Sequence, residues 1–178
     1  SLAMTGYEKY RPDRGLVANL RQTDLGGRMQ YPFVRRNFRE YAAACQQAAV
    51  TIANSEFTGG RLADLFDVEA PVIYPPIDPD AYRVPYAPDG SITMVNPRAE
   101  CKGLDMLLDI ADALPDERFL VVGSINPARL RDRVHQTANV THWRWRDDMR
   151  KVYASSRLVV VPSRYEEPFG RVAAEAMV

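Results

Sequence analysis

The sequence contains little cysteine and little histidine. Its two cysteines, Cys45 and Cys101, are far apart in the chain, and its two histidines, His135 and His142, have no cysteine or paired carboxylate at metal-ligand spacing. This pattern predicts neither a disulfide framework nor a zinc site. We therefore expect reduced cysteines that serve packing, and histidines that do not bind a metal.

Long apolar runs and an excess of one charge are also missing. The longest apolar runs, FLVVG and LVVVP, are far shorter than the roughly 20 residues that cross a bilayer. Lys+Arg and Asp+Glu each number 23, so the formal net charge is zero, which argues against general nucleic-acid binding. With no signal peptide in the sequence, we predict a cytoplasmic protein without a transmembrane segment that does not bind nucleic acid.

Several common enzyme motifs do not occur. No strand is followed by G-x-G-x-x-G, and neither G-x-x-x-x-G-K-[ST] nor G-x-S-x-G is present. The sequence therefore lacks the main support for a dinucleotide-dependent oxidoreductase, a P-loop NTPase or a hydrolase with a nucleophile elbow.

The sequence does contain a regular alternation of strand and helix patterns. Four short β-branched runs each precede an amphipathic helical pattern; the runs are residues 91–96, 118–123, 139–145 and 157–163, and the helices 103–114, 127–134, 147–156 and 170–177. This order predicts an α/β fold with a Rossmann-like parallel sheet. In the first of these helices one apolar stripe is expected to face the core, formed by Leu104, Leu107, Leu108, Ala111 and Leu114.

A proline-rich segment precedes this alternation. Residues 75–90 carry five prolines and an Asp-Gly turn signal, so we place a domain boundary there and divide the chain into residues 1–77 and 78–178. In the first part we expect a helix over residues 30–49, with Phe33, Phe38, Tyr41, Ala42 and Cys45 on its apolar spacings. Two short strands and a helix over residues 56–66, capped by Ser55, complete this part; the strands are VTIAN and VIYPP.

Candidate ligand-binding residues follow the predicted strands. In open α/β sheets, ligands bind beyond the carboxyl ends of the strands. Arg98 and Lys102 follow the first strand, Gly123 the second, and Glu167 the fourth. Two cations beside a helix start suit a phosphate group, and a solvated basic loop explains them equally well.

Glu167 and Glu175 allow two interpretations. If Glu167 sits just before the last helix, the two carboxylates lie about 12 Å apart along the helix axis. This is too far for an acid/base pair, but it suits the two ends of one ligand that has a sugar, a diphosphate and a ribose. The structural alternative is that Glu167 stabilises the helix start and Glu175 pairs with Arg171.

A family resemblance favours the first interpretation. PSRYEEPFGRVAAEAM resembles the E-x7-E signature of retaining GT-B glycosyltransferases, especially glycosyltransferase family 4, with Glu167, Phe169, Gly170 and Glu175 in register. Upstream segments are similar to the same family, so the resemblance covers about residues 50–178. It implies a partial GT-B fold that transfers sugar from a nucleotide-diphosphate sugar with retention of anomeric configuration.

The resemblance also implies roles for individual residues. Glu167 would be the catalytic residue that binds and orients the transferred sugar, and Glu175 would hold the ribose. The amides of Phe169 and Gly170 would approach the sugar and the diphosphate. Lys102 would neutralise leaving-group phosphate, while Arg98, one position off the family spacing, and Gly123 complete the predicted donor site. The family implies no metal and no cofactor other than the nucleotide-sugar substrate.

Other family features are missing from the sequence. No stretch of residues 1–49 resembles the glycine-rich loop or the histidine of the family's N-terminal domain, and the strand that follows E-A-M is not present. We therefore expect residues 1–77 to be a remnant of the acceptor-side domain and residues 78–178 to be a truncated donor-binding domain. Such a fragment is expected to be weakly active or inactive alone. Its acceptor is unknown and could be a saccharide, a lipid or a small molecule. Any peripheral membrane association would be made by the missing domain. The alternative is a non-catalytic nucleotide- or anion-binding module.

Overall fold

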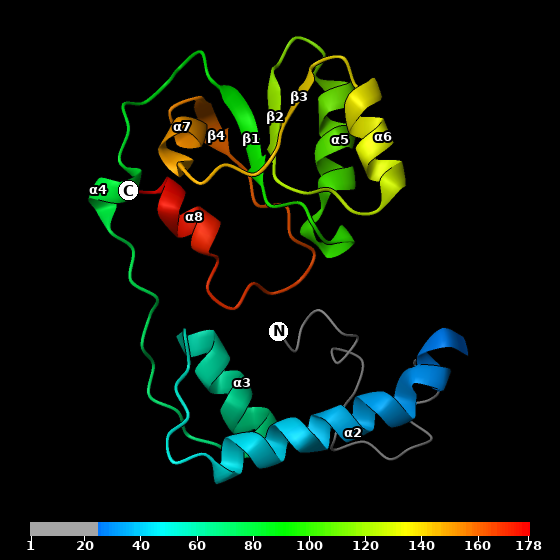
Figure 1. The fold of residues 1–178 in the computed structure, drawn as a ribbon, viewed down its shortest axis with the longest axis vertical. Coiled ribbons are helices and arrows are strands. Elements are labelled where there is room, and N and C mark those ends of the chain that lie inside the picture. The colour runs from blue at the N-terminus through cyan, green and yellow to red at the C-terminus, as the bar shows by residue number, and fades with distance from the viewer. Residues whose placement is uncertain (1–24) are drawn as a thin grey trace. The chain divides into compact units, whose positions relative to one another are not determined.

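The chain divides into two compact units, Ser1–Pro75 and Pro76–Val178. The computed structural model describes residues 25–178, drawn as a ribbon in Figure 1. No helix in this part of the chain is both long enough and apolar enough to cross a membrane. Cys45 and Cys101 are free thiols.

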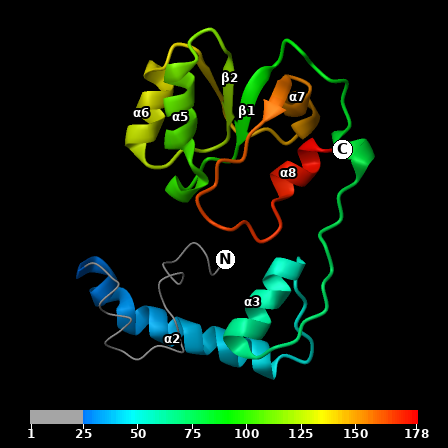
Figure 2. The same ribbon diagram turned by 180° about the vertical axis from the view of Figure 1, so that it is seen from behind.

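The described part of the first unit, residues 25–75, contains two helices, α2 (Leu25–Gln47) and α3 (Glu56–Phe66), both labelled in Figure 2. They pack through Phe38 and Phe66, whose ring centroids lie 4.9 Å apart. Phe33 and Tyr41, which we expected on the apolar face of α2, are instead 66% and 53% exposed. The buried face of α2 centres on Phe38, with Val34, Ala42 and Cys45 beside it. Phe33 falls on the far side of the helix, and Tyr41 lies at the edge of the buried face.

The segments that flank α3 confirm one prediction and contradict another. The Ser55 side chain accepts a hydrogen bond from the Thr58 backbone N–H, so it caps α3 as predicted. The two expected strands of this unit are reduced to one parallel bridge between Ala53 and Val72. Prolines interrupt the second segment, and among the described residues no third strand extends this pairing.

The second unit holds a four-stranded parallel sheet. Its strands are β1 (Ser91–Val95), β2 (Phe119–Val122), β3 (Val140–Trp143) and β4 (Ser156–Val159), paired in the order β3-β2-β1-β4. Its helices are α4 (Pro79–Tyr82), α5 (Leu104–Ala113), α6 (Ala128–Gln136), α7 (Met149–Tyr153) and α8 (Arg171–Ala176), with a 3-10 turn, η3, at Glu100–Lys102. The predicted α/β fold with a Rossmann-like parallel sheet is confirmed.

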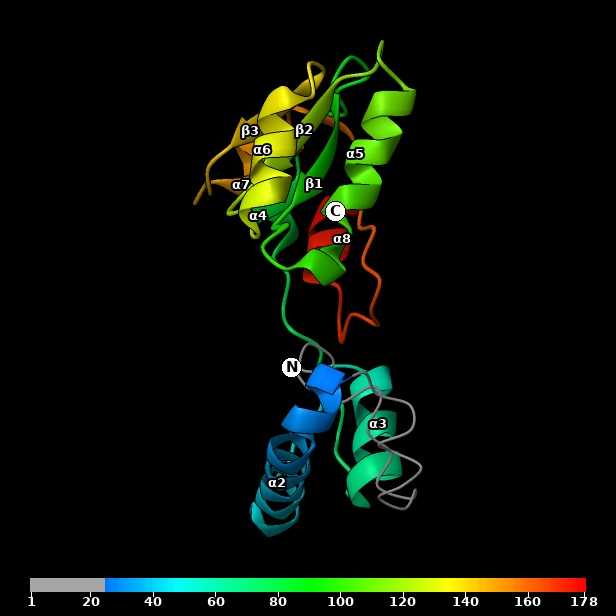
Figure 3. The ribbon, with the colours of Figure 1, turned by 90° about the vertical axis from the view of Figure 1, so that its right-hand side faces the viewer.

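Helices cover both faces of this sheet, as Figure 3 shows from the side. Alternate side chains of each strand point to opposite faces, so Met94 and Val121 pack with α5 and α6, whereas Val95 and Val122 pack with α7 and α8. The apolar stripe predicted for α5 is buried except for Leu114, which follows the last helical residue and is 45% exposed. Two hydrophobic layers therefore fix the sheet.

The strand order creates a topological switch point between β1 and β4. From β1 the chain proceeds outward through β2 to β3, and then crosses back to place β4 on the other side of β1. The connections that leave the carboxyl ends of β1 and β4 consequently diverge to opposite faces of the sheet, which opens a crevice between them.

Deletion of a core side chain from α5 should destabilise the second unit. Leu108 is fully buried and Ile110 of the same helix is 42% exposed. We expect Leu108→Ala to lower the free energy of unfolding by about 2–5 kcal/mol, because it removes buried apolar surface and leaves a cavity. Ile110→Ala should change it by less than about 1 kcal/mol. Tryptophan fluorescence during urea unfolding reports on this unit alone, since Trp143 and Trp145 are the only tryptophans in the chain; equal effects of both substitutions would contradict the packing described.

Candidate functional site

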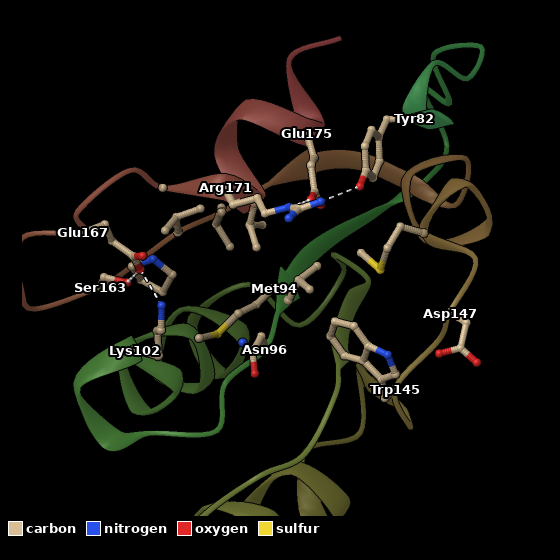
Figure 4. A pocket seen from close by; sticks show the side chains of 17 residues that line it. Tyr82, Met94, Asn96, Lys102, Trp145, Asp147, Ser163, Glu167, Arg171 and Glu175 are labelled. Atoms are coloured by element: carbon tan, nitrogen blue, oxygen red, sulfur yellow. Dashed lines mark hydrogen bonds and ion pairs between the residues drawn. The ribbon is translucent and has the colours of Figure 1, made fainter. Parts of the chain in front are cut away.

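A pocket of about 450 Å³ lies at the switch point between β1 and β4, and Figure 4 shows the side chains that line it. Four of the residues predicted from the sequence line its wall: Lys102, Glu167, Gly170 and Glu175. Lys102 comes from η3 after β1, whereas the other three come from the loop and the helix that follow β4. The sheet topology thus brings together residues that are more than sixty positions apart in sequence.

Lys102 and Glu167 form an ion pair across this crevice. The Lys102 Nζ donates to Glu167 Oε1 at 2.7 Å, and the Ser163 hydroxyl donates to the same oxygen at 2.5 Å. The Lys102 ammonium also lies 5.0 Å from the centroid of the Tyr165 ring, within the range of a cation–π contact. Both partners of the pair are largely buried, with side chains 21% and 23% exposed.

The pairing shifts the pKa of both groups toward the charged state. Burial opposes ionisation of Glu167, but the hydrogen bonds from Lys102 and Ser163 and the lysine charge outweigh it and lower the pKa of the carboxyl. Burial likewise opposes the charge on Lys102, and its hydrogen bond to Glu167 more than compensates, which raises the pKa of the amine. The pocket therefore presents a fixed cation beside a fixed anion at neutral pH.

A close backbone approach holds the two sides of the pair together. Gly103, directly after Lys102, has φ +80°, and a Cβ atom at this position would lie 2.0 Å from the Pro162 carbonyl oxygen of the β4 connection. Only glycine allows the two chain segments to approach this closely. Arg164 strengthens the same contact, because its N–H donates to the Cys101 carbonyl at 2.8 Å.

Glu175 occupies the other part of the pocket wall and is held by two donors. The Tyr153 hydroxyl donates to Oε2 at 2.8 Å, and Arg171 Nε donates to Oε1 at 2.5 Å. Arg171 also donates to the Tyr82 hydroxyl at 3.2 Å. The i,i+4 pairing of Arg171 and Glu175 that we considered from the sequence is therefore present, on a carboxylate that also lines the pocket.

The structure places Glu167 before the last helix, as the sequence analysis assumed. α8 begins at Arg171, with Gly170 as its N-cap residue at φ 73°, so Glu167 lies in the preceding loop. The separation of about 12 Å assumed a helix that extends to Glu167 and does not apply. Helix-start stabilisation is likewise wrong as an explanation of Glu167, because its partner is Lys102.

Three predicted site residues are not among the described residues that line the pocket: Arg98, Gly123 and Phe169. Arg98 is exposed in the turn after β1. Gly123 is buried at the end of β2, where its N–H donates to the Trp143 carbonyl and its carbonyl lies 2.8 Å from the His142 ring nitrogen. Phe169 immediately precedes Gly170 in the loop before α8. The roles of all three residues stay predictions.

Several residues that line the pocket, or that hold a residue of its wall, were not identified from the sequence. Ser163 had a usable signal, because it stands four residues before Glu167 in the P-S segment of the signature. Tyr153 had none, since a tyrosine in a short amphipathic helix is usually a packing residue. Asn96, Trp145 and Asp147 also line the pocket, and only the assembled sheet brings their loops to its wall.

Metal coordination has no obvious side-chain basis in the described part of the chain. Within residues 25–178, no group of three or more His, Cys, Asp or Glu side chains is arranged to hold an ion. His135 and His142 pack edge to face, with ring centroids 5.8 Å apart.

The segment that forms this site resembles a known enzyme family. Residues 91–178 match the family described as glycosyl transferases group 1. No curated protein sequence matches the chain significantly.

Solved structures share the fold. Anabaena Alr3699/HepE, crystallised with UDP and glucose, superposes with a TM-score of 0.69 at 23% identity, over 83% of this chain and 47% of its own. TarM superposes with a TM-score of 0.66 at 18% identity, over 80% of this chain and 30% of its own. A mutant of S. aureus TarM in complex with Fondaparinux, alpha-GlcNAc-glycerol and UDP gives the same values.

These matches support a GT-B fold. The described chain has the α/β fold of GT-B enzymes, and the family match falls on the unit that carries the pocket. The chain spans about half the length of Alr3699/HepE and about a third of TarM. At such low identity, the shared structure establishes the fold and leaves substrates to direct tests.

Substitution of Gly103 should destabilise the second unit more than substitution of another glycine with positive φ. Gly103→Ala would place a methyl group against the Pro162 carbonyl and force a disfavoured φ. We therefore expect it to lower the free energy of unfolding by about 2 kcal/mol or more. Gly170→Ala imposes only the φ strain, because no atom lies within 4 Å of its added Cβ, and should cost about 1 kcal/mol. Urea unfolding followed by tryptophan fluorescence measures both; a smaller loss for Gly103→Ala would disprove the close approach.

The lowered pKa of Glu167 predicts a pH-dependent contribution to stability. Its folded-state pKa lies below the unfolded value, so the contribution is complete above about pH 5 and is lost as the pH falls through the folded pKa. We expect Glu167→Gln to lower the free energy of unfolding by about 1 kcal/mol at pH 6 and by progressively less toward pH 3, as measured by urea unfolding.

Glu166→Gln provides the matched control for this titration. Glu166 is the exposed neighbour, and within residues 25–178 no side-chain hydrogen bond or ion pair engages it. Its substitution should leave the pH dependence almost unchanged. A Glu167→Gln effect that stays constant from pH 6 to pH 3 would show that the carboxylate does not titrate as described.

Proposed function

We propose that the chain binds a nucleotide-diphosphate sugar in the β1/β4 pocket and serves as the donor-binding part of a retaining glycosyltransferase of family 4. The observation that carries this proposal is that one pocket has Lys102, Glu167 and Glu175 on its wall. This combination offers a cation for a diphosphate and two carboxylates for hydroxyl groups. The family match over residues 91–178 supports the same assignment.

The proposed roles follow from the position of each group. Glu167 accepts hydrogen bonds from hydroxyls of the transferred sugar and orients it, whereas Glu175 accepts from the ribose. The backbone of Phe169 and Gly170 passes close to the sugar and the diphosphate, since glycine permits a close approach. Arg98 and Gly123, at the carboxyl edge of the sheet, complete the donor site as more distant members.

Charge balance explains why Lys102 is central. A diphosphate beside a carboxylate is repelled by about 4 kcal/mol per pair of unit charges at 4 Å and an effective dielectric constant of about 20. Lys102 has three N–H donors, of which Glu167 takes one in the structure, so it can bond to the carboxylate and a phosphate oxygen together. In this proposal protein cations supply the charge and no metal ion is required.

The proposed chemistry breaks the bond between the anomeric carbon and the diphosphate oxygen. The bonding electron pair leaves with the nucleoside diphosphate, which Lys102 stabilises as its negative charge develops. The acceptor hydroxyl oxygen bonds to the anomeric carbon from the same side, and its proton passes to a diphosphate oxygen. The configuration of the product is therefore retained.

A non-catalytic nucleotide- or anion-binding module is the second candidate. It is favoured by the fact that both pocket carboxylates already have protein partners, Lys102 for Glu167 and Arg171 for Glu175. The two functions predict different contributions of the sugar to binding affinity. In the non-catalytic module the sugar does not strengthen binding, whereas in the transferase it forms hydrogen bonds with Glu167. The acceptor, the cytoplasmic location and the weak activity expected of this chain alone stay predictions.

Binding of nucleotide sugars tests the proposal without requiring turnover. We expect one of UDP-, GDP- or ADP-sugars to bind the chain in a calorimetric titration performed with EDTA. Lys102→Ala and Glu175→Ala should each weaken that binding by about 10- to 100-fold, because each removes a hydrogen bond to a charged group. Glu167→Gln should weaken binding of the nucleotide sugar more than binding of the free nucleoside diphosphate.

Lys151→Ala is the matched control, since Lys151 is a 77% exposed lysine of α7 that does not line the pocket. It should bind as the wild type does. If no nucleotide sugar binds, or if Glu175→Ala leaves binding unchanged, the proposed site is wrong. If Glu167→Gln weakens both ligands equally, the non-catalytic module is the better description.

A further inference from the structure

Glu175 is unusual among the charged side chains of the described region. Within residues 31–178 it is the only acidic or basic residue that is buried, with 7% of its surface exposed. A buried carboxylate loses its hydration and costs several kcal/mol unless donors replace the lost water. Whatever replaces the water also fixes the direction of the carboxylate.

The two donors to Glu175 differ in how firmly they are held. Arg171 is on the same helix and its side chain is 61% exposed, so this donor can change its position easily. Tyr153 belongs to α7 and is 5% exposed, so this donor is fixed by packing and its hydrogen bond connects α7 with α8. Burial, together with the hydrogen bond to Glu175, raises the pKa of the Tyr153 hydroxyl, which keeps it protonated as a donor.

The position of the Tyr153 ring is itself fixed by neighbours. The Tyr82 ring packs against it at 6.2 Å between centroids and 65° between planes. The preceding residue, Val152, is fully buried against the sheet, and its carbonyl accepts a hydrogen bond of 2.7 Å from the buried Ser156 hydroxyl. The phenolic oxygen is therefore held at a fixed point behind Glu175, which itself lines the pocket.

The geometry leaves capacity on both oxygens of Glu175. A carboxylate oxygen has two lone pairs, so Arg171 on Oε1 and Tyr153 on Oε2 leave one acceptor site on each oxygen. Two adjacent acceptor sites match two adjacent hydroxyl donors. A vicinal diol, such as the 2′- and 3′-hydroxyls of a ribose, has this arrangement.

We propose that Tyr153 is a positioning residue that holds Glu175 in the orientation needed to bind both hydroxyls of a ribose, and so makes the pocket selective for ribonucleotides over dideoxynucleotides. This inference rests on the proposed nucleotide-sugar function and extends it to a residue outside the recognised signature. Without the phenol hydroxyl, Oε2 lacks its buried donor and the carboxylate turns toward Arg171. The diol then meets one acceptor in place of two.

The test compares Tyr153→Phe with the wild type on two matched ligands. UDP, GDP and ADP are first titrated calorimetrically, and the nucleotide that binds best is then compared with its 2′,3′-dideoxy counterpart. We expect the wild type to prefer the ribonucleotide by about tenfold or more. Tyr153→Phe should lose most of this preference, because binding of the ribonucleotide weakens while binding of the dideoxy compound does not change.

Two controls isolate the hydroxyl. Tyr86→Phe removes the hydroxyl of a 72% exposed tyrosine in the same unit and should retain the full preference. Glu175→Gln should lose the preference by itself, and the double variant with Tyr153→Phe should then lose no more. Urea unfolding by tryptophan fluorescence confirms that each variant folds.

Each remaining outcome overturns the inference. If Tyr153→Phe weakens both ligands equally, or does not fold, Tyr153 has only a structural role. If Tyr153→Phe retains the preference, Glu175 does not depend on it. If the wild type binds both forms equally, the diol is not recognised, although the nucleotide site stands; if it binds no nucleotide, the proposed function fails as well.

Discussion

The second unit depends on one close backbone contact, between Gly103 and the Pro162 carbonyl. The parallel order β3-β2-β1-β4 places the ends of β1 and β4 side by side, but a side chain at residue 103 would force the two connections apart. The missing Cβ lets Lys102 and Glu167 meet at 2.7 Å. An ion pair between residues far apart in sequence is thus a consequence of packing, and the pocket forms around it.

Much of this unit could be predicted because its signals are local. Leu104, Leu107 and Leu108 repeat at helical spacing, and the four strands are short β-branched runs between helices, so the α/β sheet followed from the sequence. Lys102 and Glu167 could be placed on one edge of the sheet, since carboxyl ends of parallel strands meet there. The resemblance to glycosyltransferases then pointed to the same residues.

The sequence-based predictions were wrong or incomplete where contacts between residues far apart in sequence determine the structure. Phe33 and Tyr41 follow the helical period, but the face that α2 buries is chosen by its contact with α3, and periodicity alone could not select it. The Tyr153–Glu175 hydrogen bond joins two helices 22 residues apart, and nothing local marks it. The 12 Å estimate for Glu167 and Glu175 assumed helical geometry over residues 167–175, but α8 begins only at Arg171, after Gly170 with its left-handed φ.

We propose that Lys102, Glu167 and Glu175 bind one nucleotide-sugar molecule in the β1/β4 pocket. A crystal structure of the chain with the nucleotide sugar that binds best is the decisive measurement. We expect a phosphate oxygen within hydrogen-bonding distance of Lys102 Nζ, the transferred sugar on Glu167 and both ribose hydroxyls on Glu175. A ligand bound elsewhere, or one that lies in the pocket without contact to Glu175, would contradict it.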